Sequence, residues 1–273
     1  MSEPTAEVPH PAASVILVRE RPGSGEVEVF LVRRHSKASF MSRSFVFPGG
    51  MADPGETDPR ITAARELFEE AGVLLADREL PGPLLRQWRD ALNAGEQRLS
   101  ELLAGSGAAI ATGELRYYSH WITPSMNTQR FAATFYVAVL PAGQGPSPDN
   151  QEAVEEAWVT PAEALARAGE LMLPPPQLRI FMEMRPDAER GLSALLEAVG
   201  ERAKHPHPIL PRGARLASGI ALLLPWDPDY LSAGTGDSLT MPADHPLAVG
   251  PSRFVLEDKT WKHIAAPTSP NAG

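Results

Sequence analysis

Three glutamates lie within a single turn of a helix that the sequence predicts over about residues 59–71. On the helical wheel, at about 100° per residue, Glu66, Glu69 and Glu70 fall within about 100° of one another. The apolar side chains of this stretch occupy the other side, at about 240° to 340° on the same wheel. They are Ala64, Leu67, Phe68 and Ala71. The pattern predicts one face that packs on a core and one that gathers carboxylates.

This gathering of like charges suits a divalent cation. Three carboxylates at positions i, i+3 and i+4 repel one another, and Arg65 beside them can offset only part of the repulsion. Hard oxygen ligands on a rigid element favour Mg²⁺ or Mn²⁺. A solvated acidic face is the alternative when the carboxylates are taken alone. The bare backbone of Phe47-Pro48-Gly49-Gly50 favours a metal site, since a glycine carbonyl could complete it.

Local signals define the elements that must position these side chains. Asp58 is the expected N-cap, Pro59 fits the first helical turn, and Gly72 follows the last. Strands are expected at residues 14–18, 26–32, 45–47, 117–122, 131–140 and 154–159. Further helices are expected over 84–103, after a Thr160–Glu163 capping box, and over 177–185 and 187–203. Because strands and helices do not alternate regularly, the fold class is α+β.

The chain changes character after Lys204. His205-Pro206-His207-Pro208 predicts an exposed linker, and short strands are expected at 220–224, 254–257 and 260–264 between Pro- and Gly-rich loops. The run from Gly234 to Ser238 lacks the Lys and the following helix of a P-loop, so a turn is expected there. We predict a disordered lead-in over 1–11, a β-rich extension over 204–265 and a flexible tail over 266–273.

The composition excludes several classes of function. Without cysteines the chain has no disulfide, thiol nucleophile or Cys-ligated zinc. With 34 acidic and 25 basic residues its formal net charge is −9, which argues against binding to nucleic acid. No apolar run approaches the roughly 20 residues of a membrane helix, and the N-terminus shows no signal-peptide pattern. We expect a cytoplasmic protein that binds neither nucleic acid nor membrane.

The segment from Gly50 to Val73 resembles the signature of the Nudix family, GX5EX7REUXEEXGU, in which U is aliphatic. Gly50 and Glu56 keep the first spacing, and residues 65–73 (RELFEEAGV) match every specified position of the second half. Eight residues rather than seven separate Glu56 from Arg65, and the loop before Pro59 must absorb the extra one. Segments over about residues 14–185 resemble the branch that contains the animal peroxisomal coenzyme A diphosphatase.

This resemblance implies a fold and a set of domains. The expected architecture is a Nudix-type α/β/α sandwich with a mixed sheet over residues 12–203. That branch carries a helical insert after the signature, which would occupy about residues 82–112 here. The β-rich extension over 204–265 matches no family we can name.

The resemblance also implies roles for particular residues. Glu66, Glu69 and Glu70 would be metal ligands together with the Gly49 carbonyl, and Arg65 would orient Glu56 or Glu66. The general base is either Glu66 or a carboxylate of residues 149–156, among which Glu152 is the candidate. The alternative is that this acidic run is the solvated edge of a loop.

Two arginines are candidates for binding the substrate. Arg34 fits part of a coenzyme A signature, although His35, Ser39 and Arg43 do not. Arg130 could meet a phosphate or a ring of the substrate, or it could be a surface strand residue.

The implied activity is Mg²⁺-dependent hydrolysis of the diphosphate in a nucleoside diphosphate linked to another moiety. Coenzyme A or an acyl-coenzyme A is the favoured substrate, and ADP-ribose, NADH or another nucleotide conjugate is the alternative. A non-catalytic module that senses nucleotides is an alternative of a different class. A homodimer is possible.

Overall fold

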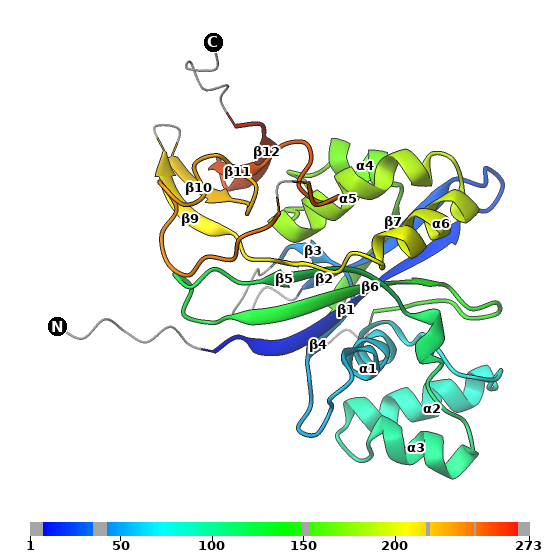
Figure 1. Ribbon diagram of the computed structural model, residues 1–273. Helices are drawn as coiled ribbons and strands as arrows, with labels where there is room; N and C mark the ends of the chain where they lie inside the picture. The colour runs from blue at the N-terminus through cyan, green and yellow to red at the C-terminus, as the bar shows by residue number, and fades with distance from the viewer. Residues whose placement is uncertain (1–7, 35–42, 149–152, 217–218, 243, 267–273) are drawn as a thin grey trace.

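The computed structural model describes residues 8–34, 43–148, 153–216, 219–242 and 244–266 (Figure 1). In this part of the chain eight strands form a central sheet whose main path runs β3-β2-β1-β6-β5-β8. β4 pairs with β1, and β7 pairs with β2. The strands are β1 (His10–Glu20), β2 (Val27–Arg34), β3 (Phe45–Val46), β4 (Gly49–Met51), β5 (Arg116–Ile122), β6 (Phe131–Val139), β7 (Ala153–Val159) and β8 (Pro208–Ile209).

The central sheet is mixed. β1 runs parallel to β6, with Ser14 opposite Phe135, and β5 runs parallel to β8. The other pairs are antiparallel, including β1 with β4, where Ser14 lies opposite Gly49. This pairing places the glycine pair at the middle of the sheet, beside the helix that follows it.

Alternating side chains of β1 pack into two different layers, as the period of two of a strand requires. Ala13, Val15 and Leu17 are fully buried in a cluster that includes one side of α1. Ile16 and Val18 are fully buried in a larger cluster on the other face, together with side chains of α5 and α6. The sheet therefore lies between two helical layers.

The helices divide between the two faces of the sheet (Figure 1). α1, α2 and α3 lie on one side, and α4, α5 and α6 lie on the other. Their bounds are α1 (Pro59–Ala71), α2 (Gly82–Asn93), α3 (Leu99–Ser106), the 3₁₀ turn η1 (Thr112–Glu114), α4 (Pro161–Ala166), α5 (Pro175–Ala188) and α6 (Leu192–Arg202). α2 and α3 pack through Trp88 and Leu102 against Phe68 of α1. This pair of helices is the insert expected after the signature.

A second, antiparallel sheet forms the C-terminal part of the chain, in the order β12-β11-β10-β9. Its strands are β9 (Arg212–Leu216), β10 (Gly219–Leu223), β11 (Arg253–Glu257) and β12 (Thr260–Ile264). Phe254 of β11 and the nearby Leu224 and Leu247 join the larger core cluster of the central sheet. The two sheets therefore share a core.

The structure confirms the α+β class, the mixed sheet between helices and the β-rich C-terminal segment. Three local predictions were wrong. β1 begins at His10, so the end of the expected lead-in belongs to the sheet. Pro208 belongs to β8 rather than to an exposed linker, and β9 was not predicted. Residues 1–7 and 267–273 lie outside the described residues.

Among the helices of the described chain, none is long and apolar enough to span a bilayer.

Candidate active site

α1 is fixed at both ends by the residues that the sequence suggested. Asp58 caps the helix by accepting a hydrogen bond from the Arg60 amide at 2.9 Å, and Pro59 occupies the first turn. Gly72 ends it in the left-handed conformation, with φ of 71°. Leu67 is fully buried on the core side. The glutamates consequently project from the opposite face.

The glycine pair lets the backbone of β4 lie directly against these glutamates. A Cβ on Gly50 would collide with the Glu66 carboxylate, and a Cβ on Gly49 would collide with Ser14 of β1. The Gly49 amide donates a hydrogen bond to Oε2 of Glu70 at 2.9 Å. Glu70 is only 6% exposed, so this member of the acidic face is not solvated.

Arg65 joins the carboxylates into one network. Its Nη1 donates to Glu66 and to Glu69, each at 2.9 Å, and its Nε donates to Glu56 at 2.9 Å. Nη2 donates to the Met51 carbonyl at 2.7 Å. Arg65 therefore contacts both of the glutamates, Glu56 and Glu66, that the sequence analysis names as its partners. Glu56 reaches the network despite the extra residue in the loop before α1.

The network shifts the protonation equilibria of its members in different directions. Burial acts to raise the pKa of Glu56, but hydrogen bonds from Arg65, the Asp53 amide and the Thr62 hydroxyl outweigh it, so that this pKa lies below its usual value. Burial raises the pKa of Glu69, and the Arg65 charge offsets only part of that rise. Burial also acts against the charged form of Arg65, but the carboxylates around it dominate and raise its pKa. Arg65 is therefore a permanent cation.

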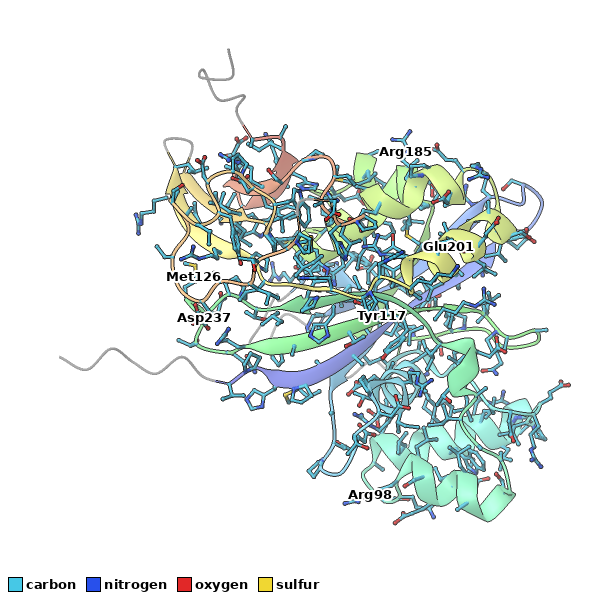
Figure 2. The ribbon with its side chains drawn as sticks, in the orientation of Figure 1. Arg98, Tyr117, Met126, Arg185, Glu201 and Asp237 are labelled. Atoms are coloured by element: carbon cyan, nitrogen blue, oxygen red, sulfur yellow. The ribbon has the colours of Figure 1, made fainter. Side chains whose placement is uncertain are left out.

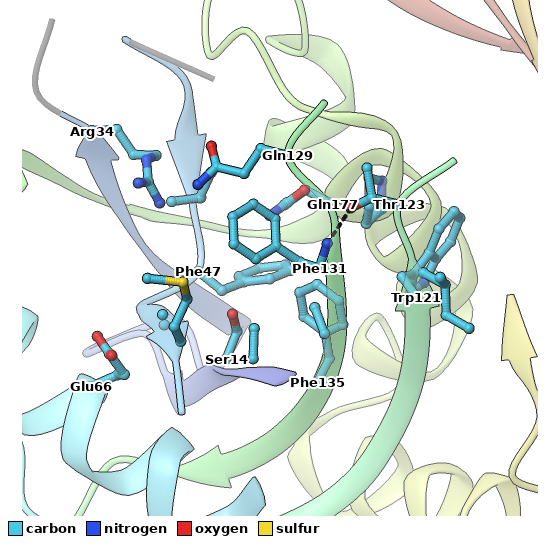
Figure 3. A pocket seen from close by; sticks show the side chains of 18 of the residues that line it. Ser14, Arg34, Phe47, Glu66, Trp121, Thr123, Gln129, Phe131, Phe135 and Gln177 are labelled. Atoms are coloured by element: carbon cyan, nitrogen blue, oxygen red, sulfur yellow. Dashed lines mark hydrogen bonds between the residues drawn. The ribbon is translucent and has the colours of Figure 1, made fainter. Parts of the chain in front are cut away.

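The glutamates line one end of a large cavity of about 920 Å³ (Figure 3). Phe47, Phe131 and Phe135 form an aromatic stretch between Glu66 and Trp121. This volume lies near the upper end of the range for small-molecule sites, about 300–1,000 Å³. The cavity can hold a ligand much larger than a single nucleotide base.

The three other candidate residues differ in their position. Arg34 lines the cavity, as a substrate-binding residue would (Figure 3). Arg130 is not among the lining residues; it is 4% exposed, donates to the Thr123 carbonyl at 3.1 Å and lies 3.3 Å from Asp237. Arg130 is therefore a buried residue held by contacts within the chain, and not the surface strand residue that was the alternative. Glu152 lies outside the described residues.

The carboxylates do not form a preassembled metal cage. Among the residues that the structure describes, no three Asp, Glu or His side chains are arranged to hold an ion. Instead, Arg65 binds oxygens of Glu66 and Glu69, and the Gly49 amide binds Glu70. The donor set nevertheless fits Mg²⁺, which usually takes only one or two carboxylates and completes its octahedron with waters and substrate phosphates.

Arg89 of α2 is a residue of the site that sequence reasoning missed. Its Nε donates to the Glu69 carbonyl at 2.9 Å, and its Nη2 donates to the Glu70 carbonyl at 2.7 Å. These are carbonyls of the last helical turn, which a cation stabilises. Arg89 thereby holds the backbone that carries two of the candidate ligands. No local pattern links the insert to this turn.

The C-terminal sheet also contributes to the cavity, which the sequence did not indicate. Ile220, Leu222 and Trp261 line it together with Met126 of the β5–β6 loop. These residues are far from the signature in sequence, and tertiary packing alone brings them there.

Comparison with known proteins agrees with this geometry. A family model, the NUDT19 Nudix domain, matches residues 52–184. The chain is 24% identical over 241 residues to "Acyl-coenzyme A diphosphatase NUDT19" of Xenopus laevis, with 62% of each chain covered. It is 33% identical over 198 residues to the Homo sapiens protein of the same name, covering 65% of this chain and 52% of the human one. The matched part is thus less than two thirds of either relative.

A solved structure shows the same fold. The crystal structure of a Nudix hydrolase from Alicyclobacillus acidocaldarius is 24% identical and aligns with a TM-score of 0.54, covering 67% of this chain and 93% of that one. The signature, the mixed sheet between helices and the family match point to one conclusion. Residues 52–184 of this chain resemble the NUDT19 Nudix domain, and the fold is that of a Nudix hydrolase.

Proposed function

We propose that the protein is a Mg²⁺-dependent pyrophosphohydrolase. It cleaves the diphosphate of a nucleoside diphosphate linked to another moiety, with coenzyme A or an acyl-coenzyme A as the favoured substrate. The observation that carries this proposal is the face of Glu66, Glu69 and Glu70, organised by Arg65, at one end of a cavity of about 920 Å³. The names of the two relatives favour the acyl-coenzyme A class.

Glu66, Glu69 and Glu70, with the Gly49 carbonyl, would hold the Mg²⁺, and Mn²⁺ could replace it. The bound ion would neutralise the diphosphate and acidify a water molecule for attack on phosphorus. Without a cation, an acidic diphosphate would be repelled by the three carboxylates. The three carboxylates can therefore lie beside an acidic diphosphate only when a cation is bound between them.

The chain's own residues supply position and charge. Arg65 fixes the orientation of Glu66 and Glu69, both of which line the cavity. Arg34 brings a positive charge to the same cavity and is suited to a phosphate group. The general base stays open between Glu66 and a carboxylate of the 149–156 segment such as Glu152.

A steady-state assay tests the activity. The purified chain is incubated with coenzyme A, a short acyl-coenzyme A, ADP-ribose and NADH in Mg²⁺, in Mn²⁺ and in EDTA, and the two phosphomonoester products of each substrate are quantified. We expect turnover in Mg²⁺, none in EDTA, and the highest kcat/KM for the coenzyme A compounds. A higher kcat/KM for ADP-ribose or NADH would contradict the favoured substrate.

A variant pair ties the activity to the acidic face. Glu69→Gln removes a charged ligand at almost constant volume and should lower kcat by at least roughly 100-fold. Glu79→Gln is the matched control, because Glu79 is exposed and does not line the cavity. An unchanged rate in Glu69→Gln would contradict the proposal. Substrate binding without turnover in the wild type would favour the nucleotide-sensing alternative.

The remaining predictions on location and assembly are part of the same proposal. We expect the protein to act in the cytoplasm and to bind no nucleic acid. A homodimer is testable by light scattering at the concentrations used in the assay. Neither expectation affects the chemistry proposed for the cavity.

A further inference from the structure

The C-terminal sheet, which lies on the side of the central sheet away from α1 (Figure 1), contributes to the lining of the cavity. Ile220 and Leu222 of β10 and Trp261 of β12 line it, and Met126 adds a side chain from the loop between β5 and β6. The same cavity also includes Glu66, so its acidic and apolar ends are continuous. A ligand bound through phosphate at one end can therefore extend to the other.

Strand register explains why the sheet presents an apolar face here. Leu222 lies opposite Phe254, and Leu256 lies opposite Trp261, so these side chains share one face. Phe254 is buried in the core shared with the central sheet. The alternate residues, such as Leu223, pack in a separate cluster on the other face. One face of the sheet thus both docks on the domain and overhangs its cavity.

Polar contacts fix the β5–β6 loop against the extension (Figure 2 labels Met126 and Asp237 at this junction). The Asp237 amide donates to the Ser125 hydroxyl at 2.9 Å, and the Asp237 carboxylate lies 3.3 Å from Arg130. A Cβ on Gly213 of β9 would collide with the Met126 sulfur, so the side chain of Met126 lies directly on this strand. The apolar end is therefore set by contacts within the chain.

The chemistry of this end favours an apolar occupant. Ile220 is 46% exposed and Met126 is 60% exposed, although both are large apolar side chains. Neither offers a conventional hydrogen-bond donor, whereas a nucleobase needs partners for its polar edges. An apolar chain would cover these side chains without leaving a polar group unpaired, and a flexible methionine adapts to chains of different length.

We propose that Ile220, Leu222, Trp261 and Met126 form a binding wall for an apolar chain attached to the nucleoside diphosphate substrate. The inference rests on the proposed function, because the phosphate end supplies the anchor. It gives the C-terminal sheet a role as a specificity element of the hydrolase domain. A substrate with a sugar in place of the chain leaves the wall uncovered.

The test compares acyl-coenzyme A substrates that differ only in chain length, from acetyl to octanoyl. For the wild-type full chain we expect kcat/KM to rise with length, by up to roughly fourfold for each methylene that is buried. In the variants Ile220→Asp and Met126→Asp, the ratio between octanoyl and acetyl substrates should fall by at least tenfold, because each places a charge beside the chain. Ile220 is in β10 and Met126 is in the β5–β6 loop, so a local folding defect at one position would not lower the ratio in both variants.

Ile264→Asp is the matched control. Ile264 is in the same sheet and is 39% exposed, but it lies opposite Arg253 on the face away from the cavity and does not line it. Its octanoyl-to-acetyl ratio should equal that of the wild type. A wild-type ratio close to one, or an equal fall in all three variants, would overturn the inference. An equal loss for every adenosine-containing substrate would place the base against the wall and would overturn it as well.

A binding measurement separates this inference from the proposed function. Calorimetric titration of the Glu69→Gln variant with the same acyl series in Mg²⁺, with and without Ile220→Asp, measures affinity with turnover suppressed. If affinity rises with chain length and falls in Ile220→Asp while the wild type hydrolyses no substrate in Mg²⁺, the wall stands and the proposed activity is wrong. If substrates are hydrolysed but neither affinity nor kcat/KM depends on chain length, the wall is wrong and the activity stands.

Discussion

Replacement of Arg65 by methionine would separate the structural and metal-binding roles of the acidic face. The Arg65 side chain is 9% exposed and forms ion pairs of 2.9 Å with Glu56, Glu66 and Glu69. Removing one partner of a buried ion pair typically costs about 3–5 kcal/mol. Because Glu69 keeps 27% of its side-chain exposure, we expect the lower half of that range, about 3–4 kcal/mol of the free energy of unfolding in EDTA.

Mg²⁺ should recover part of this loss, since a bound cation takes over the neutralisation of the carboxylates. A concentration of 100 times the Kd stabilises the folded state by about 2.7 kcal/mol. The assay is urea unfolding of the wild type and Arg65→Met, each in EDTA and in Mg²⁺. Arg78→Met is the control, because its ion pair with Asp77 is exposed and should contribute less than about 1 kcal/mol. A loss below 1 kcal/mol in Arg65→Met, or no stabilisation of either protein by Mg²⁺, would refute the reasoning.

Three further predictions follow from single contacts. Glu70→Ala removes the acceptor of the Gly49 amide and should lower the free energy of unfolding in urea by about 1–3 kcal/mol. Glu70→Gln retains an acceptor and should lower the free energy of unfolding by less. Equal losses in the two variants would contradict this prediction. Arg89→Gln should raise the Mg²⁺ concentration for half-maximal activity by about 10-fold or more. The control variant Arg86→Gln, on the exposed side of α2, should leave that concentration unchanged. The same Mg²⁺ dependence in both variants would show that Arg89 does not position the ligands. Burial lowers the pKa of His263 from 6.5 to about 3, so below pH 6.5 only the unfolded state takes up this proton, and stability should fall by up to about 1.4 kcal/mol per pH unit. His263→Phe should flatten this dependence in thermal unfolding between pH 7.5 and 5, and parallel curves would disprove the assignment.

The sequence predicted those parts of the site whose structure depends on local chemistry. Asp58 and Gly72 bound α1 because their cap preferences depend only on neighbouring backbone. The period of 3.6 residues correctly separated the buried Leu67 from the glutamate face. These features required no knowledge of tertiary contacts.

The burial of Glu70 in the acidic face was harder to predict, because it depends on β4, which the sequence did not indicate as a strand. Gly49-Gly50-Met51 has little strand propensity, yet it forms β4 by pairing with β1. That pairing brings the Gly49 amide to Glu70, whose carboxylate is buried. A pattern of side chains cannot show where an unsatisfied backbone amide will find its acceptor.

The contributions of the insert and the C-terminal sheet could not be predicted at all. Arg89 follows Glu70 by 19 residues, and nothing in the spacing indicates that its guanidinium reaches two carbonyls of α1. For Ile220 and Trp261 the sequence predicts only that they belong to short strands. Their place in the cavity follows from docking of one sheet face on the shared core, which is a property of the whole chain.

The central claim is that the face of Glu66, Glu69 and Glu70 holds a divalent cation beside Gly49. Crystals grown with Mn²⁺ and measured near the manganese absorption edge test it most directly. We expect an anomalous peak within coordination distance of at least two of these carboxylates. Crystals saturated with Mn²⁺ that show no peak there, with the glutamate oxygens still bound to Arg65 and to the Gly49 amide, would contradict it.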